Sequence, residues 1–593
     1  MKRLFILFTV MVLALAACDS GESPSGVAST NGVSIPSNAI QIDIVYAPES
    51  DLYMPQTIEE FNRAYANGTN PVTGAELASG ERPIYVTGVT GSSGTVMQGI
   101  VNAFIAPNNS NVVRPVIFQP SVSHWLALAN FQSGRQVFDL SDARATALAP
   151  VVMAIWESRL NGIRETVAER DGIPLDQVEI GWEELLEVLN SPNGWQDFGI
   201  PNGRRTVYYG HTDPFISSTA LSTLIAEFYA ASRANGFTGR EIGLDQVNDE
   251  AVQDGVRDIE QLIRHYSSRT TEFKEYIAQG PDYLDFVALE ENDLIFINLG
   301  RTEVQPPEPL VALYPKEGTF VHEHPMGIVN ADWVTDEQRE AARVFTDYVL
   351  TVPVQERIMA EGFRPANPAV TLGFPFVAQN GVALDNSFLT LDVPTPDVIA
   401  SIQQSWSFVK KQADIWLLID VSGSMGEGSK LSQAREAALA FLDNMEPSNR
   451  VGLAVFSEDV RIVVDLDTYE TNQQQLRLQI GSLQPEGGTE LYGAVQEIVG
   501  TVTASEDSDR IRAVVLLSDG EDTGNEGVTL NNATQAISAS RDALNPVIVI
   551  PVAYGSNADI NALNAIARSS NTRVQSGDPN NISAVLDVIS SYF

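Results

Sequence analysis

Short apolar runs that predict β-strands alternate along the chain with amphipathic stretches that predict helices. Strands are predicted at residues 39–48 (AIQIDIVYAP), 114–120 (RPVIFQP) and 293–300 (DLIFINLG). Helices are predicted at residues 95–104 (TVMQGIVNAF) and 339–350 (REAARVFTDYVL). This alternation from about residue 40 to residue 411 indicates an α/β architecture.

The alternation becomes more regular after a predicted helix with apolar positions at Val398, Ile402 and Trp406. We take that helix as the last element before a new domain. Strands are predicted at 414–420, 450–457, 511–519 and 545–555, and helices at 429–445, 560–568 and 582–593. The strands are continuous apolar runs, which is typical of a parallel sheet covered by helices on both faces.

Composition limits the classes of partner. The 593 residues are 44% hydrophobic, enough for two or three packed lobes. The chain has 76 acidic and 36 basic residues, and its formal net charge is −40. Such a charge repels phosphate backbones, so we expect no nucleic-acid binding.

The N-terminus has two basic residues, an apolar run from Leu4 to Ala17 and then Cys18, the single cysteine of the chain. This layout predicts a secretory signal whose apolar run is too short to span a bilayer permanently. Residues 15–18 (LAAC) resemble the lipobox of bacterial lipoproteins. The resemblance implies a signal peptide over residues 1–17 and lipidation of Cys18; the alternative is an ordinary signal peptide with an incidental cysteine.

Residues 18–39 are rich in Ser, Gly, Pro and Asn, which predicts a flexible tether. With the lipobox, this predicts a protein anchored by lipid in the cell membrane, on its extracytoplasmic face. Lipidation would leave no cysteine for a disulfide, so stability would depend on packing.

Hard oxygen ligands follow two of the predicted C-terminal strands and one glycine-rich loop. Asp420, Ser422 and Ser424 lie at the end of one strand, Asp519 ends another, and Thr489 follows two glycines before a helix. Ligand sites of doubly wound sheets form at the carboxyl ends of strands, so these segments could converge on one Mg²⁺ or Ca²⁺ ion. The alternative is that each residue only caps the following helix.

These five residues match the metal-ion-dependent adhesion site (MIDAS) of von Willebrand factor type A (VWA) domains, over about 180 residues that we place at 412–593. The resemblance implies that the serines and the threonine coordinate the ion, directly or through water, while the aspartates neutralise it. One position is left for an acidic residue of a protein partner. The resemblance implies Mg²⁺, with Ca²⁺ and Mn²⁺ as alternatives.

Three loops before helices in the N-terminal part offer hydroxyls and amides that attract anions. They lack the lysine of a Walker loop and the glycine spacing of a dinucleotide fingerprint, which argues against nucleotides. Each is also explained as a helix cap. The candidate ligand-binding residues are Ser92, Ser93, Thr95, Ser121, Ser123, Asp213 and Ser217.

This N-terminal part, residues 40–411, resembles bacterial extracellular solute-binding proteins of type II topology. The resemblance rests on residues 91–95 (GSSGT), 211–222 (HTDPFISSTALS) and 314–368; Ala220 stands where those proteins often have glycine. It implies one lobe from residues 40–145 and 310–410, a second lobe between them, and a small anionic ligand in a cleft that closes by hinge motion.

The remaining candidate residues favour packing over chemistry. His322 and His324 share one face of a predicted strand, but no third metal ligand is visible, so we expect structural histidines. We expect Trp125, Trp156 and Trp182 to pack in the interior. No Gly-x-Ser-x-Gly elbow occurs and no histidine follows His324, so we expect no enzyme.

The sequence therefore predicts an α/β protein, in which a two-lobed periplasmic-binding-protein-like module is followed by a doubly wound, Rossmann-like VWA domain. Our first functional hypothesis is a non-catalytic binding lipoprotein that uses its metal site for adhesion. The alternative is a solute-capture component of a transport or sensing system for a small anionic ligand.

Overall fold

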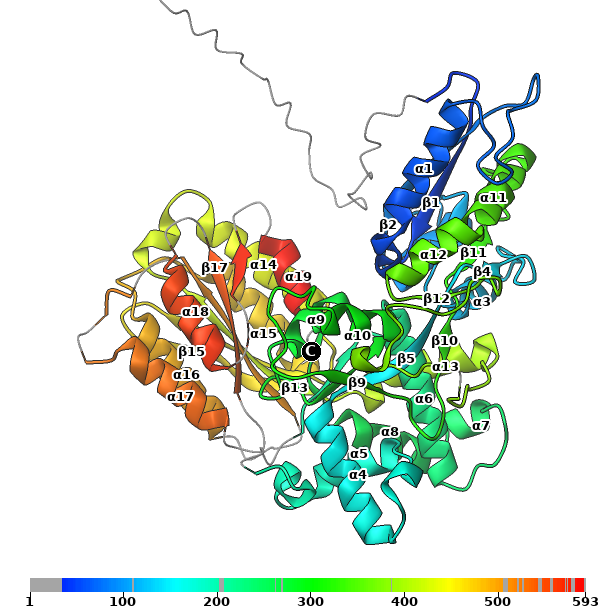
Figure 1. Cartoon of the computed structure of the whole chain (residues 1–593). Helices are drawn as coiled ribbons and strands as arrows, with labels where there is room; N and C mark the ends of the chain where they lie inside the picture. Colours follow the sequence, from blue (N-terminus) through cyan, green and yellow to red (C-terminus); the bar gives the residue numbers. More distant parts are fainter. Residues whose placement is uncertain are drawn as a thin grey trace, which may run out of the picture.

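The computed structural model describes residues 35–108, 111–201, 207–261, 263–267, 270–385, 387–504, 510–519, 522–524, 527–541, 547–554, 558–570, 572, 574–577, 582–590 and 593. The predicted signal peptide, Cys18 and most of the predicted tether lie outside these residues. The described chain forms three sheets, each with its own helices (Figure 1).

The first lobe is built on a five-stranded sheet in the order β2-β1-β3-β11-β4. Strands β1, β2 and β3 are parallel, and β11 returns antiparallel to β3. The strands are β1 (Ile40–Tyr46), β2 (Ile84–Thr90), β3 (Ile117–Gln119), β4 (Arg144–Ala145) and β11 (Pro325–Ile328). The helices are α1 (Met54–Ala66), α2 (Ser93–Ile105), α3 (His124–Ser133), α11 (Asp336–Val349) and α12 (Val352–Ala360).

The second lobe is built around the long strand β5, with which β8, β9, β10 and β12 all pair. Its strands are β5 (Ala147–Trp156), β6 (Tyr209–Thr212), β7 (Ile263–Ser267), β8 (Phe286–Glu290), β9 (Leu310–Leu313), β10 (Val321–His322) and β12 (Arg364–Pro365). Its helices are α4 (Glu157–Asp171), α5 (Trp182–Asn190), α6 (Ser218–Ala234), α7 (Leu244–Val247), α8 (Glu250–Glu260), α9 (Thr270–Ile277) and α10 (Glu291–Asn298).

The prediction of a strand at residues 293–300 is wrong, because this segment lies in helix α10. The strand is β8, which ends at Glu290 immediately before the helix. Acidic Glu291 and Asp293 lie in the first helical turn, where the helix dipole favours negative charge. A short apolar run that is buried all round shows no period that would distinguish a helix from a strand.

The described chain crosses between the lobes three times, and the first two crossings lie side by side. The first separates β4 from β5 at Thr146, and the second separates β10 from β11 at residues 323–324; the Thr146 N–H donates to the Glu323 carbonyl at 3.1 Å. The prediction that residues 310–410 belong to the first lobe is therefore wrong at both ends: β9 and β10 still belong to the second sheet, and after α12 the chain crosses back, because β12 pairs with β5. His324 has a φ of 43°, a conformation that non-glycine residues rarely adopt.

The lobes are also in contact away from the crossings. The Gly94 N–H at the start of α2 donates to the Ile216 carbonyl of the second lobe at 3.0 Å. The indole Nε1 of Trp125 donates to Ser218 Oγ at 2.9 Å. Trp125, Trp156 and Trp182 are all among the fully buried side chains, so they pack in the interior.

Helix α13 (Pro396–Val409) connects the two-lobed module to the C-terminal domain and packs against α3, α6, α7 and α8. Only residues 410–412 separate it from β13 (Ala413–Asp420). The backbone N–H of Lys411 in this connection donates to Tyr266 Oη on β7 at 2.9 Å. The predicted helix at the domain boundary is therefore present and attached to the second lobe.

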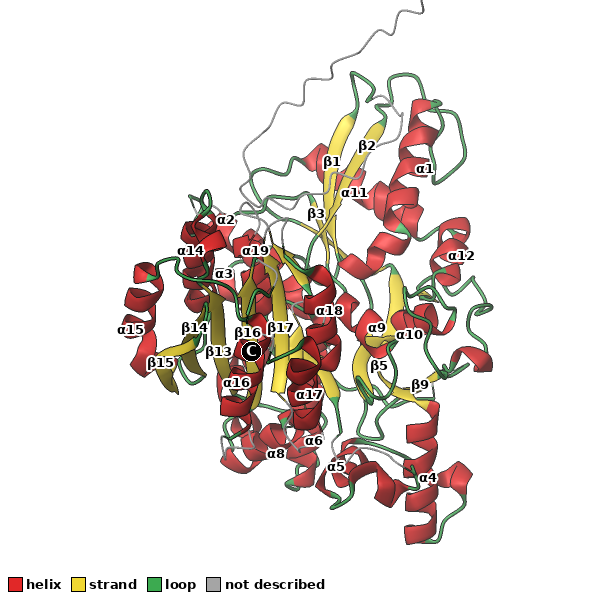
Figure 2. Cartoon of the chain, turned by 90° about the vertical axis from the view of Figure 1, so that its left-hand side faces the viewer, coloured by secondary structure: helices red, strands yellow, loops and turns green. Residues whose placement is uncertain are grey.

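The C-terminal sheet has the order β15-β14-β13-β16-β17-β18, in which β15 alone is antiparallel to its neighbour (Figure 2). Alternate residues of β13 face opposite sides, with Ile415 and Leu417 in one apolar cluster and Trp416 and Leu418 in the other. The remaining strands are β14 (Arg450–Phe456), β15 (Val460–Thr468), β16 (Ile511–Ser518), β17 (Val547–Tyr554) and β18 (Gln575–Gly577).

Three helices cover each face of this sheet. One face carries α14 (Lys430–Asp443), α15 (Tyr469–Ser482) and α19 (Ile582–Ser590), and the other carries α16 (Leu491–Thr503), α17 (Leu530–Arg541) and α18 (Ile560–Ser569). The predicted doubly wound α/β domain after two α/β lobes is therefore confirmed.

Candidate metal centre

The loop after β13 brings polar groups around Asp420, whose side chain is fully buried. The Ser422 N–H donates to Asp420 Oδ1 at 2.8 Å, and Ser518 Oγ donates to Asp420 Oδ2 at 2.9 Å. Burial raises the pKa of Asp420, its hydrogen bonds to Ser422 and Ser518 oppose this, and the nearby charge of Asp519 raises it further. A cation beside this carboxylate would offset both the burial and the repulsion.

Hydroxyl groups join Asp420's loop to the end of β16. Ser424 Oγ donates to Asp519 Oδ1 at 2.7 Å, and Ser422 Oγ lies 3.1 Å from Ser424 Oγ. The Lys430 ammonium, at the start of α14, lies 2.6 Å from Asp519 Oδ2. Four of the five predicted ligand residues thus belong to one hydrogen-bonded network.

The fifth residue, Thr489, is buried on a loop that lies against the first. The Gly423 N–H donates to the Gly487 carbonyl at 3.1 Å, and the Glu486 N–H donates to the Val421 carbonyl at 2.6 Å. Thr489 exchanges hydrogen bonds with Thr523, whose Oγ1 accepts from the Thr489 N–H at 2.9 Å. The three segments that the sequence selected therefore meet at one edge of the sheet.

The donor set fits a divalent cation. Two carboxylates and three hydroxyls are hard oxygen ligands, and two negative charges match a 2+ ion. Lys430 already pairs with Asp519: burial disfavours the ammonium, but the hydrogen bond and charge of Asp519 raise the pKa of Lys430 overall. An ion bound at Asp519 would compete with this ammonium for the same carboxylate.

The von Willebrand factor type A domain family matches residues 414–587. The C-terminal part of the chain therefore carries a VWA domain, a class of domain that commonly binds a divalent metal ion at this site and mediates protein–protein interactions.

Individual relatives cover only parts of the chain. Inter-alpha-trypsin inhibitor heavy chain H1 of Sus scrofa is 29% identical over 179 residues, which are 28% of this chain and 19% of that protein. The chain spans at most about a fifth of the length of the first curated relatives that it matches.

Two solved structures each align with part of the chain. A von Willebrand factor type A protein from Catenulispora acidiphila aligns with 31% of this chain and 43% of its own, at 20% identity and a TM-score of 0.27. The sulfate-binding protein SubI from Mycobacterium tuberculosis H37Rv aligns with 56% and 88%, at 18% identity and a TM-score of 0.35.

Two of the predicted ligand-binding serines of the first lobe lie together. The Ser121 N–H donates to Ser93 Oγ at 3.3 Å, and Ser121 Oγ donates to Glu49 Oε2 at 3.1 Å. Thr95 is exposed. Ser92 precedes α2 without a side-chain cap bond, and the Ser123 N–H donates to Glu323 Oε1 at 3.2 Å.

The predicted residues of the second lobe hold the turn before α6. Asp213 Oδ1 accepts from the Phe215 N–H at 2.7 Å. Ser217 Oγ accepts from the Ala220 N–H at 3.2 Å and lies 2.7 Å from Thr270 Oγ1. Because Gly94 bonds to Ile216, this turn meets the start of α2, so the two lobes bring these candidate loops together at their contact.

Sequence reasoning missed a buried polar cluster beside the crossings, centred on Glu290 at the end of β8. Glu290 Oε1 lies 2.7 Å from His322 Nδ1, and Glu290 Oε2 lies 3.2 Å from His324 Nε2. The outer ring nitrogens of these histidines contact hydroxyls, His322 Nε2 at 2.9 Å from Ser222 Oγ and His324 Nδ1 at 3.2 Å from Ser50 Oγ. The His-x-His spacing of His322 and His324 is the signal in the sequence that points to this cluster. Their shared partner, Glu290, could not be found in this way because it lies more than 30 residues earlier in the chain.

Opposed effects set the charges in this cluster. Burial alone would raise the pKa of Glu290, but the two histidines lower it to about 2. Burial, and then the charges of Glu290 and Asp293, raise the pKa of nearby Glu49 to about 7. The junction of the lobes is therefore rich in carboxylates.

Proposed function

We propose that this chain is a non-catalytic, extracytoplasmic binding protein whose VWA domain binds a protein partner through a divalent cation. Mg²⁺ is the ion that we propose for Asp420, Ser422, Ser424, Thr489 and Asp519. Mg²⁺ keeps part of its water shell in an incomplete protein site, so a carboxylate of the partner can replace a water.

The observation that carries this proposal is the network from Asp420 through Ser422 and Ser424 to Asp519. It joins the ends of β13 and β16, because Asp420 and Asp519 are 99 residues apart in the sequence but belong to the same hydrogen-bonded network. Caps of separate helices would have no reason to be linked in this way. Polar groups so arranged can turn together toward one ion.

Calorimetric titration of the purified chain with Mg²⁺, and separately with Mn²⁺, tests the proposal. We expect weak binding that strengthens when an aspartate-containing peptide is present and that Asp420→Ala and Ser422→Ala remove. Ser432→Ala is the matched control, because this exposed serine lies on α14 and bonds only to the carbonyl of Ser429 among the described residues. Wild-type chain that binds neither ion, even with the peptide, would refute the metal site.

We also propose attachment to the membrane through a lipid on Cys18. In the part of the chain that the structure describes, no helix has the length and apolar character needed to cross a membrane. Cys18→Ser is expected to move the protein from the detergent phase to the aqueous phase on phase partitioning. A Cys18→Ser protein that still enters the detergent phase would contradict lipid anchoring.

Capture of a small anionic solute remains the alternative prediction. The Gly94 amide, which an anion at the start of α2 would need, already donates to Ile216, and Glu49 lies beside Ser121. A ligand would therefore have to separate the lobes at this point and tolerate a carboxylate. Calorimetry with sulfate, phosphate and small organic acids tests this role, and saturable binding that Ser93→Ala weakens would support it.

A further inference from the structure

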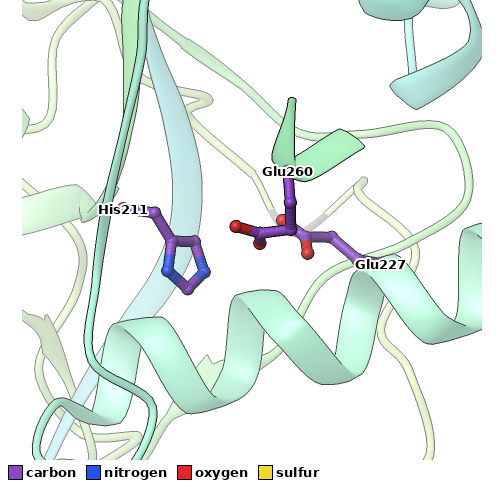
Figure 3. A group of neighbouring side chains, drawn as sticks. All are labelled: His211, Glu227 and Glu260. Atoms are coloured by element: carbon purple, nitrogen blue, oxygen red, sulfur yellow. The ribbon is translucent and has the colours of Figure 1, made fainter. Parts of the chain in front are cut away.

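A second group of ligating side chains lies inside the second lobe, far along the chain from the MIDAS residues. His211 on β6, Glu227 on α6 and Glu260 at the end of α8 each offer one ligand atom, and these atoms all lie within 4.8 Å of one another. The relative exposures are 2% for His211 and 0% for both glutamates. Figure 3 shows the imidazole turned toward two carboxylates that lie against each other.

The hydrogen bonding of His211 leaves one nitrogen free to act as a ligand. Its Nδ1 lies 2.6 Å from the Thr212 carbonyl, which can only accept, so Nδ1 carries the proton. Burial lowers the pKa of His211 to about 4, so the ring is neutral near pH 7. Nε2 then has a lone pair and, among the described residues, no hydrogen-bond partner. Metal-binding histidines are usually held in this way, with the second nitrogen donating to a carbonyl or carboxylate.

The two carboxylates are incompletely satisfied. Glu227 Oε2 and Glu260 Oε1 are buried without a hydrogen-bond partner among the described residues. Their other oxygens contact tyrosines: Tyr209 Oη lies 3.5 Å from Glu227 Oε1, and Tyr266 Oη donates to Glu260 Oε2 at 2.8 Å. Buried polar atoms are almost always paired, so an unpaired atom on each of three neighbouring side chains needs an explanation.

Repulsion between the carboxylates adds to this need. Burial, and then the charge and hydrogen bond of Glu260, raise the pKa of Glu227 well above its usual range. Burial raises the pKa of Glu260 to about 7, against the hydrogen bonds with Glu227 and Tyr266, which lower it. A shared proton would relieve the repulsion but would leave His211 Nε2 unsatisfied. A divalent cation satisfies all three atoms, and its charge equals that of two carboxylates and a neutral imidazole.

We propose that His211, Glu227 and Glu260 bind a divalent transition-metal ion of the zinc type, as a structural site inside the second lobe. An imidazole ligand favours such ions over Mg²⁺ and Ca²⁺. Metal–ligand bonds of about 2.0–2.2 Å place the atoms of a tetrahedral shell about 3.4 Å apart. Small side-chain rotations that move the three ligand atoms by about 1 Å would bring them to that spacing. A water or a neighbouring tyrosine hydroxyl completes the shell.

This site joins elements that are separate in the sequence. Trp406 of α13 stacks on the His211 ring, with centroids 5.2 Å apart, and Tyr266, which holds Glu260, also accepts from Lys411. The ion would therefore connect β6, α6 and α8 beneath the helix that leads to the VWA domain. Its role is independent of the function proposed for the MIDAS residues.

Metal retention by the full chain tests the proposal. The chain is folded with Zn²⁺, passed through a desalting column and analysed for metal by mass spectrometry; we expect about one zinc ion per chain. Glu260→Gln and His211→Gln are expected to weaken zinc binding on the order of 100-fold, since even the residues that only support a metal ligand cost 10–100-fold. Substituted Co²⁺ should show visible absorption bands that both variants lose.

Two control variants separate this site from other cation sites. Glu250→Gln changes an exposed glutamate at the other end of α8, and Asp420→Ala disables the MIDAS; both are expected to keep the zinc ion. Glu260→Gln replaces a contact between two acceptors with an N–H that can donate to Glu227, so it should fold even if His211→Gln does not. Wild-type chain without zinc, zinc retained by Glu260→Gln, or zinc lost from Asp420→Ala would each overturn the proposal.

Discussion

Glu290 and the pair Glu227 and Glu260 are equally buried in the same lobe, yet their environments have opposite effects. Two histidines hold Glu290 and lower its pKa to about 2, whereas Glu227 and Glu260 face each other and burial raises their pKa values. Helix α6 serves both places, since it carries Ser222, which contacts His322, and Glu227. The difference shows that the available donors, and not depth alone, determine whether a buried carboxylate is ionised.

The largest expected effect comes from removing Glu290. Glu290→Ala leaves His322 and His324 buried without their shared partner, and we expect a loss of about 3–5 kcal/mol in the free energy of unfolding. Urea denaturation measures it. Glu290→Gln, which keeps the shape and one acceptor, should cost clearly less. A loss below about 1 kcal/mol for Glu290→Ala would remove the distinction between the two carboxylate environments.

The same cluster predicts how stability depends on pH. The Glu290 pKa falls from 4.5 to about 2 on folding, so its contribution is present above pH 4.5 and is lost as pH falls toward 2. Burial lowers the pKa of His324, but the charge of Glu290 outweighs this and raises that pKa above 6.5. The contribution of protonated His324 to stability is therefore present below pH 6.5 and is lost at higher pH.

The free energy of unfolding of the wild-type chain should therefore exceed that of Glu290→Gln by the largest amount between pH 4.5 and 6.5. The expected difference is up to about 3 kcal/mol, since one pKa unit corresponds to about 1.4 kcal/mol. Urea titrations of both chains across this range, with a chelator present, measure the difference. A difference that does not vary with pH would contradict the assignment of these charges.

Glu260→Gln tests the opposite environment. In the presence of a chelator we expect this variant to be more stable than wild type by about 1–2 kcal/mol, because an unpaired acceptor gains a donor. The exposed control Glu250→Gln should stay within about 0.5 kcal/mol of wild type. With zinc present the order should reverse, because wild type alone gains the energy of binding. Thermal unfolding with and without zinc measures both.

The smallest expected effect concerns Lys430, whose ammonium pairs with Asp519 of the proposed metal site. Lys430→Met removes the ammonium from Asp519, and we expect a loss of about 1 kcal/mol in stability without metal. Because the ammonium competes with the ion, Mg²⁺ should bind about fivefold more tightly, which corresponds to about 1 kcal/mol. Calorimetry measures the affinity, and weaker Mg²⁺ binding in Lys430→Met would show that the lysine supports the ion.

The sequence allowed the fold class to be predicted because long apolar strands and amphipathic helices alternate. Asp420, Ser422 and Ser424 could be proposed as metal ligands because they form a short motif on one loop. His211, Glu227 and Glu260 could not, since they come from three elements and each looks like an ordinary buried or helical residue. Helix α10 was mistaken for a strand because Leu294, Ile295 and Ile297 are all buried.

The short joint between α13 and β13 has a mechanical consequence. Residues 410–412 form a linker of only three residues. The Lys411 backbone N–H donates to Tyr266 of the second lobe, and the Lys410 ammonium lies 3.5 Å from Glu446 of the VWA domain. A protein partner bound at the proposed metal site would therefore pull directly on the interior of the second lobe rather than stretch a linker. Force on the VWA domain would reach the interior of that lobe, beside Trp406 and His211.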